Sequence, residues 1–355
     1  MKSTTEVNRY KNGQARVAAV PIRPGDHERE VQIKKILIVG AGVIGSFNAA
    51  RLKEAGHDVT LLARGRRLAD LREHGVVLEN SRTGRSTTQV PLVDRLGPED
   101  AYDLAIVVVR RNQIPSILPL LAQDHCIPSI LFLGNNAAGA QDIVQALGRE
   151  RVLIGMVNAG GERQGYVVRY LWSRWLPLQF SELDDAPTPR TDAIVRLFRS
   201  AGLPTRVRKN VDAYLKTHAA GLPAIAGAVY MAGGDIRRLA HMPEVLRLVV
   251  RAYREALRAL RTAGIPLKPS VTHLVEWIPE PILMFGLRLF FDTQLAVVGG
   301  ERRINAAPDE MKEIADEFRE IFRQADLPSP ASDILFAQVD ARFQAGAARV
   351  PQGIP

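Results

Sequence analysis

The chain has 355 residues, of which 46% are hydrophobic and 24% are charged, an ordinary balance for a globular protein. This length exceeds one typical domain and predicts two. The single cysteine, Cys126, excludes an internal disulfide, and we expect a cytoplasmic protein without a metal site. We find no secretory signal pattern and no unbroken apolar run of about 18 residues, so a membrane span is not expected.

A polar stretch, residues 1–33, precedes a pattern that predicts a β-α-β unit. The stretch carries prolines and charges, so we expect a flexible extension. Ile36–Val39 is typical of a strand, a helical pattern follows, and Val59–Leu62 predicts a second strand. The turn between strand and helix has the G-x-G-x-x-G spacing of dinucleotide-binding proteins, formed by Gly40, Ala41, Gly42, Val43, Ile44 and Gly45.

Each glycine of this turn has a separate physical task. Gly40 allows the tight turn, Gly42 lets the backbone approach a pyrophosphate, and Gly45 lets the helix pack on the strand. The pyrophosphate would rest at the helix N-terminus, where free N–H groups favour negative charge. The alternative is a glycine-rich turn with no ligand, which the two flanking strands make less plausible.

The end of the second predicted strand selects between cofactors. NAD enzymes usually have an acidic residue there, about 20 residues beyond the glycines, that binds the ribose 2′-hydroxyl. Here the strand delivers Arg64, followed by Arg66 and Arg67. A guanidinium can pair with a 2′-phosphate, which a carboxylate would repel, so the sequence favours NADP(H). The alternative is three solvated arginines on a loop.

Polar residues follow the next two predicted strands. Leu104–Val109 is a continuous apolar run that ends at Arg110 and Gln113, and Ser129–Leu133 ends near Asn135. Ligands of open α/β sheets bind outside the carboxyl ends of the strands, so these side chains are candidates to meet cofactor or substrate. For Asn135, ordinary turn chemistry is the alternative.

The second half of the chain has helical patterns. They cover about 191–201, 212–231, 243–263 and 308–325, and the last has Pro308 and two acidic residues in its first turn. We therefore predict an α/β fold, with a Rossmann-type parallel-sheet domain at residues 34–185. An all-helical substrate and catalytic domain is expected at residues 186–345, and residues 346–355 are expected to form a tail.

The formal net charge of +9 raises the question of a polyanionic partner. Five arginines recur at steps of four and three residues and would line one helix face: Arg247, Arg251, Arg254, Arg258 and Arg261. Such a stripe could hold nucleic acid or an acidic partner. No nucleic-acid motif accompanies it, so we favour the solvated side of an amphipathic helix and expect neither nucleic acid nor membrane as a partner.

Several segments resemble the ketopantoate reductases (2-dehydropantoate 2-reductases) of pantothenate biosynthesis. V-T-L-L-A-R-G-R-R, V-V-V-R-R-N-Q, F-L-G-N-N-A-A-G and Y-L-K-T-H-A-A are similar to that family's motifs, over about residues 34–340. The resemblance implies that Arg64 binds the phosphate and that Arg110, Gln113 and Asn135 face cofactor and substrate. It also places the general acid on Lys216 and a substrate-binding glutamate on Glu310, which could orient substrate or pair with Lys216.

The sequence also departs from this pattern. Arg110 replaces a lysine, and Ala220 and Ala224 replace asparagines that would lie on the helix face of Lys216. Without those amides a site discriminates poorly for a polar substrate. Apart from the resemblance, Lys216 reads as a surface lysine, and His218 is the second candidate for the acid.

The expected function is reduction of a 2-oxo acid or related carbonyl by NADPH, with ketopantoate as the substrate that the resemblance implies. One alternative is a related oxidoreductase with a less polar substrate. Another is a catalytically silent NADP(H)-binding sensor or partner-binding protein, suggested by the lost amides and the arginine stripe. The expected partner is a small carbonyl compound, and the sequence leaves a homodimer open.

Overall fold

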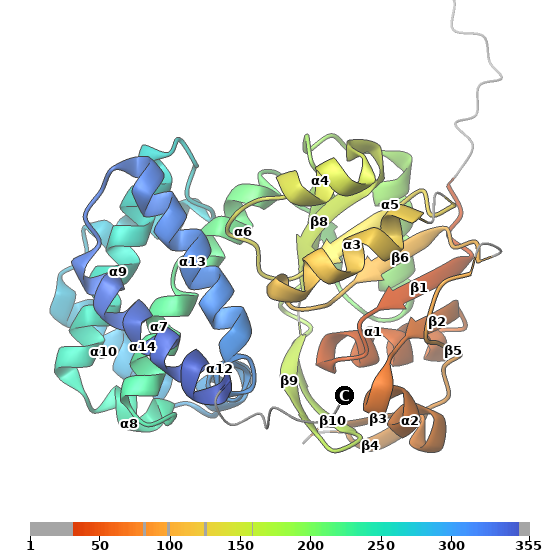
Figure 1. The fold of residues 1–355 in the computed structure, drawn as a ribbon, viewed down its shortest axis with the longest axis horizontal. Helices are drawn as coiled ribbons and strands as arrows, with labels where there is room; N and C mark the ends of the chain where they lie inside the picture. Colours follow the sequence, from red (N-terminus) through yellow and green to blue (C-terminus); the bar gives the residue numbers. More distant parts are fainter. Residues whose placement is uncertain (1–30, 81–82, 98–99, 124–125, 158, 348–355) are drawn as a thin grey trace, which may run out of the picture.

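A computed structural model describes residues 31–80, 83–97, 100–123, 126–157 and 159–347. The chain forms two lobes, an α/β lobe with a large sheet and a helical lobe (Figure 1). This confirms the predicted class, a parallel-sheet domain followed by a helical region. The predicted flexible extension and tail lie almost entirely outside the described residues.

The sheet of the first lobe has eight strands, and all neighbours are parallel except β8 and β11. β1 lies between β2 and β6, with Leu37 beside Thr60 of β2 and Ala105 of β6. In spatial order the strands are β12 (Thr205–Val207), β11 (Leu178–Glu182), β8 (Val152–Met156), β7 (Ile130–Leu133), β6 (Leu104–Val107), β1 (Lys35–Val39), β2 (Asp58–Leu62) and β5 (Leu92–Val93).

Both faces of this sheet are covered, which explains why its strands are continuous apolar runs. Ile36 and Ile38 of β1 enter one buried cluster, whereas Leu37 and Val39 enter another on the opposite face. The lobe's helices are α1 (Val43–Glu54), α2 (Gly65–His74), α3 (Ile114–Gln123), α4 (Gln141–Leu147) and α5 (Pro189–Ser200), with short helical turns at Arg111–Gln113 and Arg149–Arg151.

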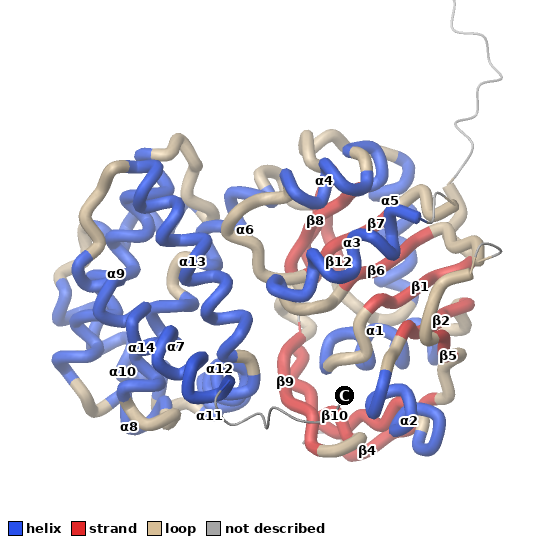
Figure 2. The backbone as a smooth tube through the Cα atoms, in the orientation of Figure 1, coloured by secondary structure: helices blue, strands red, loops and turns tan. Residues whose placement is uncertain are grey.

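A second, four-stranded sheet lies below α1 in Figure 2. Its spatial order is β4 (Gly84–Thr88), β3 (Val76–Asn80), β10 (Val167–Trp172) and β9 (Ala159–Gln164). Phe47 of α1 packs on Tyr170 of β10, with ring centroids 4.9 Å apart. This contact joins the small sheet to the helix that begins at the glycine turn.

The first lobe extends beyond the expected boundary at residue 185. Strand β12 pairs with β11, and Ile194 and Phe198 of α5 belong to the same buried cluster as β1. Helix α6 (Val211–Ala219) connects the two lobes, because Val211 and Leu215 pack in a buried cluster of the first lobe and Ala219 packs in that of the helical lobe.

The helical lobe contains a predicted helix that the structure divides. The pattern over 212–231 forms two helices, α6 and α7 (Leu222–Met231), separated at Ala220 and Gly221. Pro223 lies in the first turn of α7, where its missing N–H leaves no hydrogen bond unmade. The prediction of one continuous helix was therefore wrong, because the proline begins a second helix. The other helices are α8 (Ile236–Ala240), α9 (Pro243–Thr262), α10 (Glu280–Phe291), α11 (Gln294–Ala296), α12 (Arg302–Ala306), α13 (Pro308–Ala325) and α14 (Pro330–Ala347), with short turns at Ser270–Glu276 and Val297–Glu301.

Within the described residues, no single helix has both the length and the apolar character to cross a membrane. One pair of helical segments, Glu280–Phe291 and Gln294–Ala306, meets the length and composition criteria together, but the two are bent by 76°.

Candidate active site

The glycine turn has the geometry that a bound pyrophosphate requires. Gly40 has φ of +110°, which L side chains rarely adopt, and a Cβ on Gly45 would lie 1.7 Å from the Gly40 carbonyl oxygen. At Gly42, in contrast, an added Cβ would meet no atom within 4 Å. The turn is thus closed where helix meets strand and open where a ligand would approach α1, so the residues present fit a dinucleotide.

Arg64 stands at the end of β2 and forms the N-cap of α2. Its side chain is exposed, and its Nε donates a long hydrogen bond of 3.4 Å to the carbonyl of Asp94. No carboxylate pairs with this guanidinium in the part of the chain that the structure describes. Arg64 is therefore available to bind a phosphate beside the glycine turn.

Arg67 has a role that the sequence did not single out. It is buried, and its Nε donates to the Ala41 carbonyl at 3.0 Å while one Nη donates to Ser46 Oγ at 2.9 Å. Its other Nη donates to the Tyr166 carbonyl at 3.1 Å. Burial lowers the pKa of Arg67 to about 10, with the nearby charge of Arg163 adding to the effect. Arg67 thus fixes the glycine turn to α1 and to the small sheet.

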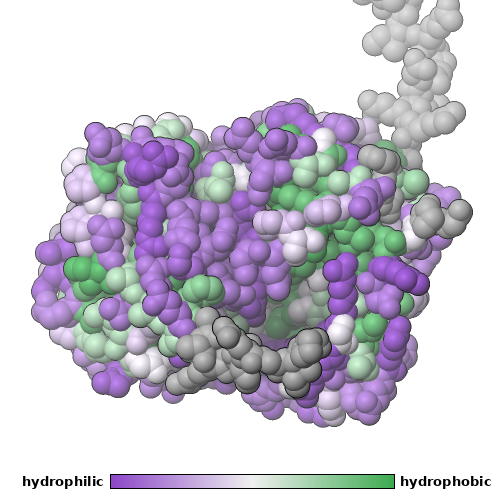
Figure 3. Space-filling model, viewed as in Figure 1, coloured by the Kyte–Doolittle hydropathy of each residue, from purple (hydrophilic) through white to green (hydrophobic). Residues whose placement is uncertain are grey.

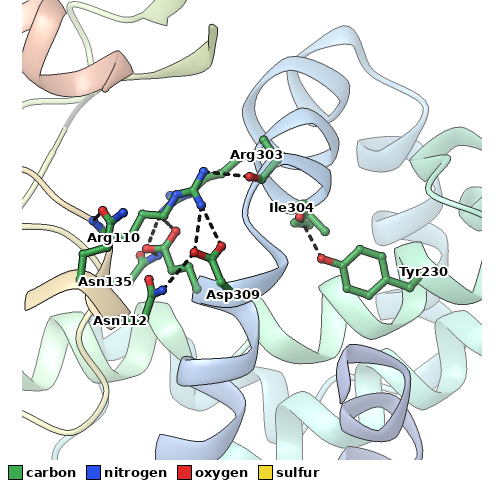
Figure 4. Close-up of polar contacts among 10 residues, drawn as sticks. Arg110, Asn112, Asn135, Tyr230, Arg303, Ile304 and Asp309 are labelled. Atoms are coloured by element: carbon green, nitrogen blue, oxygen red, sulfur yellow. Dashed lines mark hydrogen bonds and ion pairs between the residues drawn. The ribbon is translucent and has the colours of Figure 1, made fainter. Parts of the chain in front are cut away.

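Arg110, expected to face the cofactor, reaches the helical lobe. Its guanidinium donates to both carboxylate oxygens of Asp309, at 2.8 and 3.1 Å, and to the Ala306 carbonyl at 2.8 Å. Asn112 donates to the same carboxylate at 3.0 Å (Figure 4). Burial alone would raise the pKa of Asp309, but Arg110 and Asn112 outweigh it and lower that pKa. Gln113 turns back to accept from the Arg110 backbone N–H at 3.2 Å.

A second bridge between the lobes is more deeply buried. Arg111 Nε donates to Glu317 of α13 at 2.6 Å, and the two side chains are 6% and 7% exposed. The other oxygen of Glu317 accepts from the backbone N–H groups of Ala137 and Ala138, at 2.9 and 3.2 Å. Glu317 therefore ties the loop after β7 to the helical lobe.

Asn135 and Glu310, both predicted site residues, are in direct contact. Asn135 is 2% exposed, and its Nδ2 donates to Glu310 Oε1 at 3.0 Å. Arg303 of α12 also donates to Glu310, at 3.3 Å. Tyr230 donates to the carbonyl of Ile304, which ties α12 to α7 (Figure 4).

Two amide oxygens of side chains that contact α13 are buried without a hydrogen-bond partner among the described residues. They are Oδ1 of Asn135 and Oδ1 of Asn112. Because the Asn135 amide must present its Nδ2 to the Glu310 carboxylate, the orientation of its oxygen is fixed by that bond. An orphaned buried acceptor is costly, so each oxygen suits a donor supplied by a ligand.

Lys216 of α6 lies largely buried beside the loop after β7. Its Nζ donates to Asp212 Oδ2 at 2.6 Å, and its side chain is 15% exposed. It comes within 3.3 Å of where a Cβ on Gly139 would lie. The pairing of Glu310 with Lys216, offered as one expectation, is not the arrangement observed: Glu310 binds Asn135 and Arg303 instead.

The pKa of His218 is lowered, although its side chain is exposed. Burial, with the charge of Arg303 adding, lowers its pKa to about 4. At neutral pH the imidazole is uncharged and carries no extra proton, which makes His218 poorly suited to be the acid.

Ala220 lies one helical turn after Lys216, because it is the C-cap of α6 and its N–H donates to the Lys216 carbonyl at 3.0 Å, whereas Ala224 belongs to the next helix, α7. Both alanines are 1% exposed and pack in the helical core with Ala137. The place of the expected amides is thus filled by methyl groups.

The sequence was compared with known families and structures. The model of the family "Ketopantoate reductase PanE/ApbA" matches residues 36–183, which spans the first lobe from β1 to β11. A 2-dehydropantoate 2-reductase of Archaeoglobus fulgidus is 23% identical over 231 residues, covering 64% of this chain and 75% of the relative. These matches confirm the resemblance seen in the motifs.

Solved structures share the arrangement of both lobes. A candidate ketopantoate reductase from Ralstonia solanacearum superposes with a TM-score of 0.74 at 21% identity, covering 89% of this chain and 99% of its own. A ternary structure of D-mandelate dehydrogenase with NADH and anilino(oxo)acetate gives a TM-score of 0.73 at 18% identity, covering 88% and 98%. At these identities the likeness establishes the fold.

Proposed function

Because this chain is a distant member of the ketopantoate reductase family PanE/ApbA, we propose that it is an NADPH-dependent reductase of a 2-oxo acid. The observation that carries the proposal is the open glycine turn together with the Arg64 guanidinium, which no carboxylate of the described residues pairs with. Both lie outside the carboxyl ends of β1 and β2, where open α/β sheets bind their ligands.

The choice of NADPH rests on charge. The similar D-mandelate dehydrogenase structure contains NADH, so the fold by itself does not select NADPH. In this chain Arg64 occupies the position where a carboxylate would favour NADH, and it has no acidic partner among the described residues. A 2′-phosphate would supply that partner through a charge-assisted hydrogen bond.

The proposed chemistry adds a hydride to the carbonyl carbon and a proton to its oxygen, which yields a 2-hydroxy acid. The reduced nicotinamide supplies the hydride when it is bound. Lys216 would donate the proton to the developing alkoxide and regain one from solvent, with Asp212 holding its ammonium in place. Asn135, whose position Glu310 and Arg303 fix, would accept a hydrogen bond from ligand through its orphaned oxygen.

The substrate we favour is a 2-oxo acid less polar than ketopantoate. Ala220 and Ala224 are buried where amides were expected, so the site has fewer groups to bind substrate hydroxyls. Anilino(oxo)acetate, the molecule in the D-mandelate dehydrogenase structure, carries a large apolar group beside its oxo acid.

The test is steady-state oxidation of NADPH and NADH with a panel of 2-oxo acids that includes ketopantoate and phenylglyoxylate. We expect turnover with NADPH, higher kcat/KM for the aromatic compound, and loss of at least about 100-fold in kcat for Lys216→Ala. A matched control, Lys312→Ala, removes a half-buried lysine of α13 that pairs with Asp316 and Asp340, and it should retain activity. Tight binding of NADPH without turnover of any compound would favour the silent sensor instead.

A further inference from the structure

Helix α12 places two consecutive arginines where the helical lobe meets the first lobe. Arg302 donates to Glu162 of β9 at 2.6 Å and so ties the helix to the small sheet. Arg303 contacts a different carboxylate, because its Nη2 donates to both oxygens of Glu310, at 3.3 and 3.5 Å. Asn135 donates to the same carboxylate from the first lobe (Figure 4). Arg303 therefore lies next to the groups that we propose to contact the ligand.

The other cations at this junction already have close carboxylate partners. In Figure 3 the surface where α13 faces the first lobe is largely hydrophilic. Three further ion pairs of the described residues lie in this region: Arg110 with Asp309 at 2.8 Å, Arg111 with Glu317 at 2.6 Å and Lys216 with Asp212 at 2.6 Å. Arg303 lies 3.3 Å from its carboxylate, beyond the length of about 2.7–2.9 Å of a strong charge-assisted bond. Its guanidinium is thus the most weakly paired cation of this group.

The Arg303 guanidinium also retains most of its donors. Nη2 is its only nitrogen that donates to a described residue. Because Nη2 has one hydrogen on each forked edge of the guanidinium, the edge turned away from Glu310 keeps both of its donors. Such a fork binds a carboxylate through two parallel hydrogen bonds. The side chain is 35% exposed, so a small anion can reach it.

The backbone of α12 is held in place on both sides of Arg303. Tyr230 donates to the Ile304 carbonyl at 2.8 Å, and Asn305 Nδ2 donates to the Gly234 carbonyl at 2.8 Å. The guanidinium is therefore carried on an anchored element. A cation that is positioned in advance binds an anion at a smaller cost in conformational entropy.

Arg303 also lies near α6, the helix that carries Lys216. Burial and the charge of Arg303 together lower the pKa of His218, which is two residues after Lys216 on that helix. The imidazole is consequently neutral at pH 7 and does not repel an anion or neutralise the arginine. The guanidinium and the proposed proton donor thus belong to the same region of the site.

We propose that Arg303 binds the carboxylate of the 2-oxo acid, an assignment that rests on the proposed function. The carbonyl and the carboxylate of such a substrate are on adjacent carbon atoms, so their protein partners must be neighbours. Lys216 would protonate the carbonyl oxygen while the open fork of Arg303 holds the carboxylate. A neutral compound of the same shape would leave that fork without a charged acceptor, so Arg303 would select acids over esters and ketones.

Calorimetry with anilino(oxo)acetate and with its methyl ester, each added to the chain saturated with NADPH, tests this assignment. The oxo group of both compounds belongs to an amide and resists reduction, so binding is measured without turnover. We expect the wild-type chain to bind the acid about 100-fold more tightly than the ester, and Arg303→Met to lose most of this preference. Arg303→Lys keeps a cation beside Glu310 but lacks the fork, so it should lose about tenfold of the preference.

Arg238→Met is the matched control, because it removes an exposed arginine of α8 in the same lobe. It should keep the full preference for the acid. Circular dichroism checks that each variant is folded, and Arg303→Lys decides the outcome if Arg303→Met is not.

Three results would overturn the assignment. Equal weakening of acid and ester binding would show that Arg303 only positions Glu310, and an unchanged preference would give the carboxylate to another group. A wild-type chain that binds neither compound, or binds both equally, would have no such anion site. Turnover of phenylglyoxylate with NADPH reports separately on the proposed function. Its absence would contradict that function, whereas the ratio of the two binding constants would still decide the role of Arg303.

Discussion

At the scale of single residues, Arg64 and Arg67 should have separable effects on the cofactor. Arg64→Ala removes the proposed phosphate partner, so KM for NADPH should rise about 10- to 100-fold while KM for NADH changes little. Arg67→Met removes the bonds to Ala41 and Ser46 that hold the glycine turn, so both KM values should rise together. Initial rates with the two cofactors measure this, with Arg72→Ala on exposed α2 surface as control. An Arg64→Ala enzyme that still prefers NADPH would contradict the assignment.

His218 should make stability depend on pH. Its folded-state pKa of about 4 lies below the ordinary value of 6.5, so between those values the unfolded chain binds a proton that the folded chain does not. Stability should therefore fall as pH decreases from about 6.5 towards 4. Urea midpoints at pH 7.5 and 5.0 test this, and His218→Gln should lose less than the wild-type chain. Equal losses in the two proteins would show that other groups cause the decline.

At the scale of elements, the N-terminus of α14 depends on one buried carboxylate. Glu255 of α9 accepts from the backbone N–H groups of Ala331 and Ser332, at 3.0 and 2.8 Å, and from Ser332 Oγ at 2.7 Å. Glu255→Ala should lower the free energy of unfolding by about 2–3 kcal/mol, because it leaves these donors buried and unpaired. Chemical denaturation measures the loss, with exposed Glu244→Ala as control. An unchanged midpoint would mean that water replaces the carboxylate.

The sequence predicted elements best where local pattern decides the outcome. The β-α-β unit follows from glycine spacing and apolar runs, and α9 and α13 follow from helical periodicity with prolines at their first turns. The break between α6 and α7 was missed because a proline can either kink a continuous helix or lie in the first turn of a new one, and the sequence around Pro223 fits both. Strand β12 was missed as part of the first lobe because three residues carry too little periodicity to identify a strand.

At the scale of the whole molecule, the parts of the site that join the lobes could not be read from the sequence. Arg110 and Asp309 are 199 residues apart, and nothing local in either segment indicates that they meet. The resemblance named Asn135 and Glu310 separately, whereas their contact depends on how α13 packs beside the loop after β7. Arg67 was missed as a positioning residue because a buried arginine and a solvated one look alike in sequence.

The buried pair of Arg111 and Glu317 should couple the stability of the two lobes. Arg111→Met leaves the Glu317 carboxylate buried without its cation, which typically costs about 3–5 kcal/mol. The double variant Arg111→Met/Glu317→Leu removes both charges and should recover part of that loss, although Ala137 and Ala138 then lose their acceptor. Chemical denaturation of the two single variants and the double variant gives the coupling energy. We expect a coupling energy above about 1 kcal/mol. Additive losses from the two single variants would show that the lobes are held together by other contacts, such as the more exposed pair of Arg110 and Asp309.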